Sequence, residues 1–292
     1  MLNSEKILLS DDGRVYMVPY ILDESPEMPV SVKRPAVMVV PGGGYSMTSD
    51  REAEPIALAF SCEGFQTFVL RYSVGPYASW PNPQVDLMRA MKTVRDNAEK
   101  WHVDKDAIAV CGFSAGGHLT ASLGVFWNDQ ELQKAAGATC EDVKPNALIL
   151  CYPVIDSGKH GHQGSINILW KGHEDEPELR ERFALQNQVG PHTPPSFIVH
   201  TYYDNCVPVE NSLLFAEALA KYDIPFELHI TQNGVHGLAL GNELTSSNNP
   251  YMVNKKFSGW PEKSADWLRE LFGYNFPDEP KHPSARGLKR NF

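Results

Sequence analysis

Residues 107–116 read AIAVCGFSAG, an aliphatic run followed at once by the pattern Gly-x-Ser-x-Gly. The run 107–111 is short and continuously apolar, which is typical of a strand covered on both faces of a parallel sheet. Residues 117–127 have the composition of a helix. This order predicts a sharp strand-turn-helix unit that lifts the hydroxyl of Ser114 clear of the sheet. A glycine-rich turn without chemistry is the alternative.

Five further runs have the same character as residues 107–111 and predict strands at residues 36–40, 67–70, 147–151, 196–200 and 226–230. Helical patterns lie between them. The clearest covers residues 84–100, whose apolar side chains form one stripe, and another opens with Pro208 and continues to Tyr222. Strands that alternate with helices predict right-handed βαβ units, and therefore an α/β fold with a doubly wound, mostly parallel sheet and helices on both faces.

Two segments depart from this rhythm. Residues 6–9 and 15–22 predict an antiparallel hairpin at the sheet edge, turned near Gly13. Residues 156–195 are rich in His, Gly, Gln and Glu, with one helix expected near 176–186, and they lie where an insertion could form a small cap. We expect a single domain over residues 1–276 and a Pro- and Lys-rich tail over residues 277–292.

A second glycine-rich turn, Pro41-Gly42-Gly43-Gly44-Tyr45, follows the predicted strand 36–40. Consecutive glycines leave backbone N–H groups unshielded, so these groups can point at an anion. Acyl transfer needs such donors where the tetrahedral oxyanion forms. Phosphate is the other candidate anion, but the GxxxxGK[ST] and GxGxxG patterns are absent from this turn.

A serine hydroxyl is a weak nucleophile at neutral pH unless a positioned base removes its proton. Among ten histidines, His236 stands between two glycines in the turn after the strand 226–230. His118 lies four residues after Ser114 and is expected to pack or support the site instead. The sequence therefore predicts His236 as the base.

The acid that orients this base is expected at the end of the preceding strand. Asp204 follows the run 196–200 directly, and its carboxylate could hold the imidazole in one tautomer. Capping the next helix is the alternative role for Asp204, and Glu210 is the reserve candidate for the acid. The order Ser114, Asp204, His236 is the order in which nucleophile-elbow hydrolases supply their triad.

With these motifs in this order, the chain resembles the esterase branch of the α/β-hydrolase superfamily, near hormone-sensitive-lipase-like carboxylesterases and bacterial acetyl or acetylxylan esterases. The resemblance spans residues 35–274. It implies oxyanion donors from the backbone of Gly43, Gly44 and Ala115, and chemistry without a metal or organic cofactor. Pro41 departs from the histidine that often opens the HGGG motif. Because the predicted strands start almost at once, we expect no long N-terminal cap of the lipase-like kind, and therefore an open site.

Composition narrows the partners and the compartment. Acidic residues outnumber basic ones 36 to 26, giving a net charge of −10, which argues against nucleic acid. No signal-peptide core opens the chain, and no run approaches the ~18 apolar residues of a membrane helix. Five scattered cysteines without a CxxC pair suggest neither a disulfide framework nor a zinc site. We expect a cytoplasmic protein without membrane association, and a homo-oligomer is compatible with the sequence.

The sequence thus predicts a serine carboxylesterase that hydrolyses short acyl esters, acetyl esters above all, of a sugar or related alcohol through an acyl-Ser114 intermediate. Its partner is a small-molecule ester. Tyr45, beside the oxyanion glycines, is expected to contact the substrate and narrow the acyl side. An amide or peptide hydrolase, formamidase-like or prolyl-peptidase-like, uses the same triad and is one alternative. A non-catalytic binding protein on the hydrolase scaffold is the other.

Overall fold

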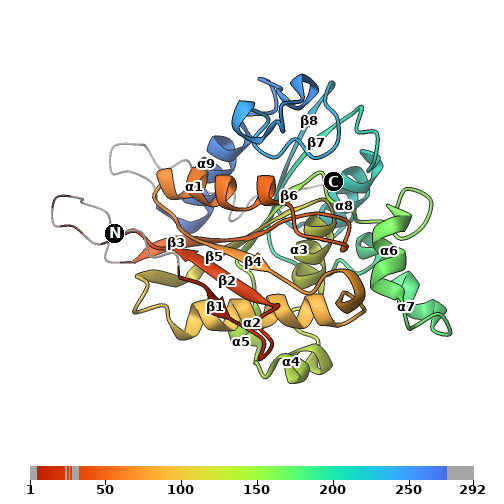
Figure 1. Cartoon of the computed structure of the whole chain (residues 1–292), viewed down its shortest axis with the longest axis horizontal. Helices are drawn as coiled ribbons and strands as arrows, with labels where there is room; N and C mark the ends of the chain where they lie inside the picture. Colours follow the sequence, from red (N-terminus) through yellow and green to blue (C-terminus); the bar gives the residue numbers. More distant parts are fainter. Residues whose placement is uncertain (1–4, 24, 26, 28–32, 275–292) are drawn as a thin grey trace.

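The computed structural model describes residues 5–23, 25, 27 and 33–274, so the expected tail over residues 277–292 lies outside the described residues (Figure 1). Within these ranges, one sheet of eight strands runs in the order β1-β2-β4-β3-β5-β6-β7-β8. The strands are β1 (Ile7–Leu8), β2 (Tyr16–Tyr20), β3 (Arg34–Val40), β4 (Gln66–Arg71), β5 (Val103–Phe113), β6 (Ala147–Cys151), β7 (Ser196–Thr201) and β8 (Phe226–Thr231).

The pairing of the strands confirms the predicted doubly wound sheet. Strands β3 to β8 pair in parallel, while β2 runs antiparallel to both β1 and β4. The hairpin predicted at the edge is present, with Ile7 opposite Met17. The chain order reverses at β3, which lies between β4 and β5. The carboxyl ends of β3 and β5, which carry the two glycine-rich turns, therefore lie next to each other.

Helices cover both faces of this sheet (Figure 1). Along β3, Met38 and Val40 belong to one apolar cluster and Val37 and Val39 to the other, because successive strand residues point to opposite faces. The first cluster includes side chains of α2, α3 and α8, and the second those of α1 and α9. The helices are α1 (Glu54–Cys62), α2 (Asn82–Asp96), α3 (Ser114–Phe126), α4 (Gln130–Ala136), α5 (Cys140–Val143), α6 (Gln163–Trp170), α7 (Pro177–Arg182), α8 (Glu210–Lys221) and α9 (Trp260–Phe272).

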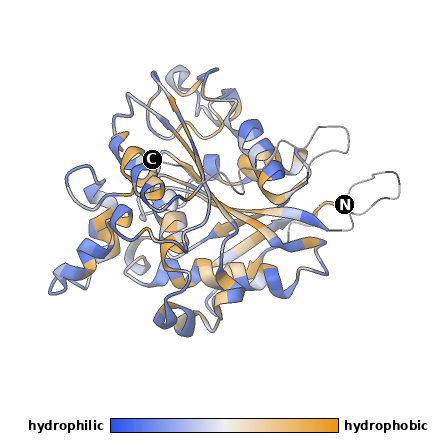
Figure 2. Ribbon diagram, turned by 180° about the vertical axis from the view of Figure 1, so that it is seen from behind, coloured by the Kyte–Doolittle hydropathy of each residue, from blue (hydrophilic) through white to orange (hydrophobic). Residues whose placement is uncertain are grey.

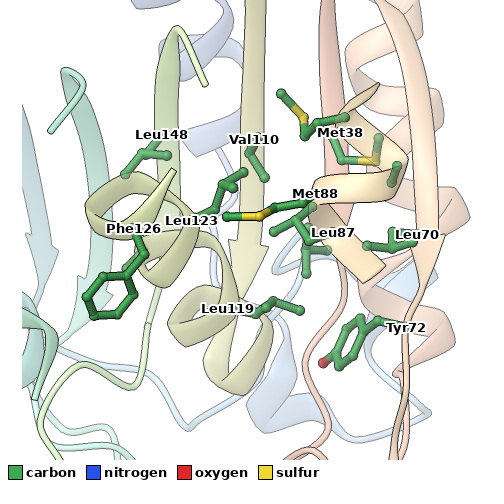
Figure 3. Close-up of a cluster of buried hydrophobic side chains, with 14 of the residues drawn as sticks. Met38, Leu70, Tyr72, Leu87, Met88, Val110, Leu119, Leu123, Phe126 and Leu148 are labelled. Carbon is green, nitrogen blue, oxygen red and sulfur yellow. The ribbon is translucent and has the colours of Figure 1, made fainter. Parts of the chain in front are cut away.

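Apolar side chains from different elements meet between α2, α3 and the sheet. Figure 3 shows Met88 of α2 beside Leu123 of α3, close to Val110 of β5. Figure 2 shows that hydrophobic residues run along the central strands, whereas hydrophilic residues gather on the outer parts of the molecule. Burial of this kind contributes ~25 cal/mol per Å² of apolar surface removed from water. The helix after the serine is therefore held firmly on the sheet.

The helices differ from the predicted ranges at several points. Helix α2 ends at Asp96 rather than at residue 100. Helix α8 begins at Glu210, because Pro208 lies in a preceding turn whose carbonyl accepts the N–H of Asn211 at 3.0 Å. The insertion over residues 156–195 contains two helices, α6 and α7, where one was predicted. In the part of the chain that the structure describes, no helix has the length and apolar character that a membrane span requires.

Candidate active site

The Gly-x-Ser-x-Gly sequence forms the sharp turn that was predicted. Strand β5 ends at Phe113, and α3 begins at Ser114 itself, whose φ of 53° is in the left-handed region. A non-glycine residue there costs about 1–3 kcal/mol, and the surrounding packing must hold it. The neighbours have to be glycines. A Cβ added at Gly116 would lie 2.3 Å from the carbonyl oxygen of Val40, and one at Gly112 would lie 2.2 Å from Oγ1 of Thr120.

The structure brings Ser114, His236 and Asp204 together. Nε2 of His236 lies 2.8 Å from Oγ of Ser114, and its Nδ1 lies 2.7 Å from Oδ2 of Asp204. The other carboxylate oxygen of Asp204 accepts the N–H groups of Cys206 and Val207, both at 2.9 Å. Asp204 therefore orients the imidazole and also stabilises the turn before α8. The carboxylate that contacts His236 is that of Asp204 and not that of Glu210.

The Asp204 carboxylate is ionised in this environment. Its side chain is 1% exposed, and burial acts to raise its pKa. The hydrogen bonds from His200 and His236, together with the charge of His236, outweigh burial and hold the pKa of Asp204 well below its usual range. The His236 ring also packs edge-on against Tyr152, with ring centroids 5.1 Å apart. Its orientation is fixed by these contacts on two sides.

The glycine loop after β3 lies against the serine. A Cβ added at Gly42 would lie 3.0 Å from Cβ of Ser114. Gly43 and Gly44 both have positive φ, at 127° and 65°, which glycine adopts without steric cost. The N–H of Ala115 belongs to the first turn of α3, where N–H groups have no acceptor within the helix. The structure thus places all three predicted oxyanion donors in segments adjoining Ser114.

The expectation that Tyr45 narrows the substrate site is wrong. The side chain of Tyr45 is 0% exposed, and its hydroxyl lies 2.9 Å from Nδ1 of His118. Nε2 of His118 donates to the carbonyl of Phe183 at 3.1 Å, so Nδ1 accepts the tyrosine proton. Burial lowers the pKa of His118 to about 4, which keeps this ring neutral. Tyr45 is buried because its ring fills the core while its hydroxyl keeps a partner. The expected packing role of His118 is confirmed.

Sequence reasoning missed a buried network behind the site. Oε2 of Glu52 accepts the N–H of Gly42 at 2.9 Å, and Oε1 accepts the hydroxyl proton of Tyr152 at 2.8 Å. The Tyr152 hydroxyl in turn accepts the N–H of Ala239 at 2.9 Å. Nothing in the stretch Asp50-Arg51-Glu52 indicates this role, because acidic residues in a turn are usually solvated.

The neighbouring Arg51 extends this network to the histidine loop. Its Nη1 donates to the carbonyl of Gly237 at 2.7 Å and to that of Thr245 at 3.2 Å. Arg51 and Glu52 therefore connect the glycine loop with the turn that carries His236. Across the described ranges, no group of three or more His, Cys, Asp or Glu side chains is arranged to hold a metal ion.

A serine lies at a strand-helix elbow, and its hydroxyl hydrogen-bonds to a histidine that in turn hydrogen-bonds to an aspartate. Both partners follow later strands of a doubly wound sheet, and this arrangement defines an α/β hydrolase. The BD-FAE family model matches residues 26–219, and the chain belongs to the BD-FAE family. The chain is 38% identical over 232 residues to the endo-1,4-beta-xylanase B of Butyrivibrio fibrisolvens, covering 78% of this chain and 34% of that protein. It is 33% identical over 238 residues to the acetylxylan esterase of Xylanibacter ruminicola, covering 80% of this chain and 45% of that one. The chain thus spans less than half the length of these curated relatives.

Solved structures confirm the fold over nearly the whole chain. The carboxylesterase Cest-2923 from Lactobacillus plantarum superposes with a TM-score of 0.81 at 27% identity, covering 93% of this chain and 98% of that one. The acetyl ester-xyloside bifunctional hydrolase from Caldicellulosiruptor lactoaceticus gives a TM-score of 0.77 at 35% identity, covering 94% and 99%. The resemblance to α/β-hydrolase esterases is therefore confirmed.

Proposed function

We propose that the chain is a serine carboxylesterase that hydrolyses short-chain acyl esters, acetyl esters above all, of a sugar or related alcohol. The observation that carries this proposal is the contact of 2.8 Å between Oγ of Ser114 and Nε2 of His236, with Asp204 bonded to the opposite nitrogen. The names of the relatives, an acetylxylan esterase and an acetyl ester-xyloside hydrolase, support the substrate class.

The proposed reaction has two halves. His236 takes the proton of Ser114 as Oγ attacks the ester carbonyl carbon, and the Asp204 carboxylate stabilises the imidazolium that forms. Backbone N–H groups of Gly43, Gly44 and Ala115 donate to the oxyanion. The imidazolium then protonates the leaving alcohol, which departs and leaves an acyl-serine. Water, deprotonated by His236, attacks this acyl group, and the carboxylic acid leaves as Ser114 regains its proton.

The direct test compares esters with an amide. We expect the purified chain to hydrolyse p-nitrophenyl acetate and acetylated xylo-oligosaccharides, and to hydrolyse acetyl p-nitroanilide far more slowly. The readouts are p-nitrophenolate absorbance, released acetate and p-nitroaniline absorbance. Turnover of the anilide at a rate equal to or above that of the esters would instead favour an amide hydrolase.

Acyl preference is expected to peak at about two to four carbons and to decline for longer chains. In the insertion, the apolar side chains of Ile166 and Leu169 are fully buried in the core cluster, so they are not available to wall a long acyl channel. A deep apolar pocket would gain about 0.8 kcal/mol per methylene, roughly a fourfold rise in kcat/KM at each step. The measurement is kcat/KM for p-nitrophenyl esters from acetate to octanoate. An octanoate value equal to or above the acetate value contradicts the prediction.

Glu52→Gln is expected to lower kcat by about tenfold with a smaller effect on KM, because a buried group without its partner costs about 1–3 kcal/mol. The carboxylate accepts from both Gly42 and Tyr152, whereas an amide offers one oxygen and turns its NH₂ toward the other donor. The glycine loop should then lose its alignment with the oxyanion.

The matched control for this prediction is Glu54→Gln, two residues further along the chain. In the described part of the chain, the hydrogen bond of the Glu54 carboxylate comes from the hydroxyl of Tyr20, at 3.3 Å, and not from either loop of the site. Kinetics on p-nitrophenyl acetate should show wild-type values for the control. If Glu52→Gln keeps the wild-type kcat, the hydrogen bonds of Glu52 do not align the glycine loop for catalysis.

A further inference from the structure

Residues 154–156, which lead into the insertion, are hydrogen-bonded to segments that carry the triad. The N–H of Val154 donates to the carbonyl of Ser114 at 3.0 Å. Oδ1 of Asn211, in α8 just after the Asp204 turn, accepts the N–H groups of Ile155 and Asp156 at 2.8 and 2.9 Å. The segment 154–156 therefore leaves the sheet between the nucleophile and the acid.

The same segment then reaches the glycine loop. Ser165, in the first turn of α6, is fully buried, and its Oγ would lie 3.8 Å from a Cβ added at Gly44. Residues 154–165 thus pass the triad from the side of the acid to the side of the expected oxyanion donors. His162 lies on this path, directly before α6, and is partly exposed.

Hydrogen bonds determine which nitrogen of His162 carries the proton. Nδ1 accepts the backbone N–H of Ser165 at 3.3 Å and lies 2.8 Å from its Oγ. A backbone N–H can only donate, so Nδ1 is unprotonated, and the neutral ring carries its proton on Nε2. Within the described residues, the hydrogen bonds of this imidazole are all made by Nδ1. The Nε2–H group is therefore an uncommitted donor.

Burial favours the neutral form of the His162 ring, and the charge of His236 acts on it in the same direction. Burial lowers the pKa of His162, and the charge of His236 lowers it further, against a smaller opposing effect of Asp204. A cation at this place would favour anionic ligands, whereas a neutral N–H donor suits an uncharged oxygen. The leaving alcohol must lie beside His236 to receive its proton. Ser165 holds the His162 ring and lies against Gly44 of the glycine loop, so this donor is held beside the site where that alcohol would bind.

We propose that His162 and Ser165 form a binding subsite in which the Nε2–H of His162 donates to a free hydroxyl of the alcohol that carries the acyl group. Ser165 holds the ring in place. The ligand class is a polyhydroxy alcohol such as a partly acetylated sugar, and this inference rests on the proposed esterase function. An aryl alcohol without a second hydroxyl offers no partner to this donor.

The test compares His162→Asn with the wild-type chain on acetylated xylo-oligosaccharides and on p-nitrophenyl acetate. Asparagine retains a side-chain acceptor that can cap α6 but lacks the reach of the imidazole Nε2–H. We expect the ratio of kcat/KM for the sugar ester to kcat/KM for the aryl ester to fall by about threefold to tenfold, the effect of losing one hydrogen bond. A partly unfolded sample loses both activities equally, so a change in this ratio reports a change in the subsite and not a loss of folded protein.

His173→Asn is the matched control, since its imidazole lies in the same insertion but bonds to Glu176 and to the carbonyl of Trp80. Its ratio should equal that of the wild type. Equal losses on both esters in His162→Asn, or no loss on the sugar ester, would overturn the subsite while leaving the proposed function standing. Absence of turnover of either ester by the wild-type chain would overturn the proposed function and the subsite with it.

Discussion

Ser114→Ala is expected to reduce kcat for p-nitrophenyl acetate by about 10⁶-fold, the loss found when the nucleophile of a serine hydrolase triad is removed. In the proposed reaction this hydroxyl attacks the ester, and its hydrogen bond in the structure is to Nε2 of His236. The side chain is small and nearly buried, so its removal leaves the packing of α3 intact. Steady-state kinetics at high enzyme concentration measure the loss, and the thermal unfolding midpoint should change little.

Ser122→Ala is the matched control on the same helix. Oγ of Ser122 is buried and has no hydrogen-bond partner within the described residues, so its removal should leave turnover at the wild-type level. A fluorophosphonate probe should label the wild-type chain and Ser122→Ala at Ser114, and should not label Ser114→Ala. Substantial turnover of the aryl ester by Ser114→Ala would show that another group is the nucleophile.

The central strands β3, β6 and β7 were predictable because each is buried on both faces. In β6 and in residues 107–113 of β5, the same burial requires continuous apolar runs, which stand out in the sequence. The glycine-flanked serine follows such a run directly, so the elbow could be inferred from sequence alone. The same logic placed Asp204 and His236 at the ends of later strands, where parallel topology brings them to one edge of the sheet.

Side-chain direction after a turn was not predictable. Tyr45 follows two glycines with positive φ and itself has a φ of 59°. Each such dihedral redirects the chain, and sequence proximity to the oxyanion loop does not show on which side the next ring will point. The Tyr45 ring points into the core because it is buried there and its hydroxyl hydrogen-bonds to His118 of α3. The missing signal was His118, whose ring nitrogen is a suitable partner for a buried tyrosine.

The polar contacts between segments distant in the sequence could also not be predicted. Glu52 meets Tyr152 across 100 residues of sequence, and neither residue belongs to a recognisable motif. Helix α6 was missed because its cap is a histidine rather than the usual Ser, Thr, Asp or Asn. Its apolar spacing, with Ile166 and Leu169 three residues apart and both buried, was the one available signal.

Asp204→Asn is expected to lower kcat by about 10⁴-fold, because it would reverse the tautomer of His236. The amide oxygen of Asn would take over the N–H groups of Cys206 and Val207, which now bond to Oδ1. The amide NH₂ would then face Nδ1 of His236, which must become an acceptor and leave the proton on Nε2. An Nε2–H imidazole cannot remove the proton of Ser114.

Glu210→Gln serves as the control, because Glu210 is the other carboxylate considered for this role and lies at the start of α8. It should retain wild-type kcat on p-nitrophenyl acetate. Since the pKa of Asp204 is held well below its usual range, the carboxylate stays ionised at neutral and mildly acidic pH. The reverse ranking, with activity lost in Glu210→Gln and retained in Asp204→Asn, would assign the acid to Glu210.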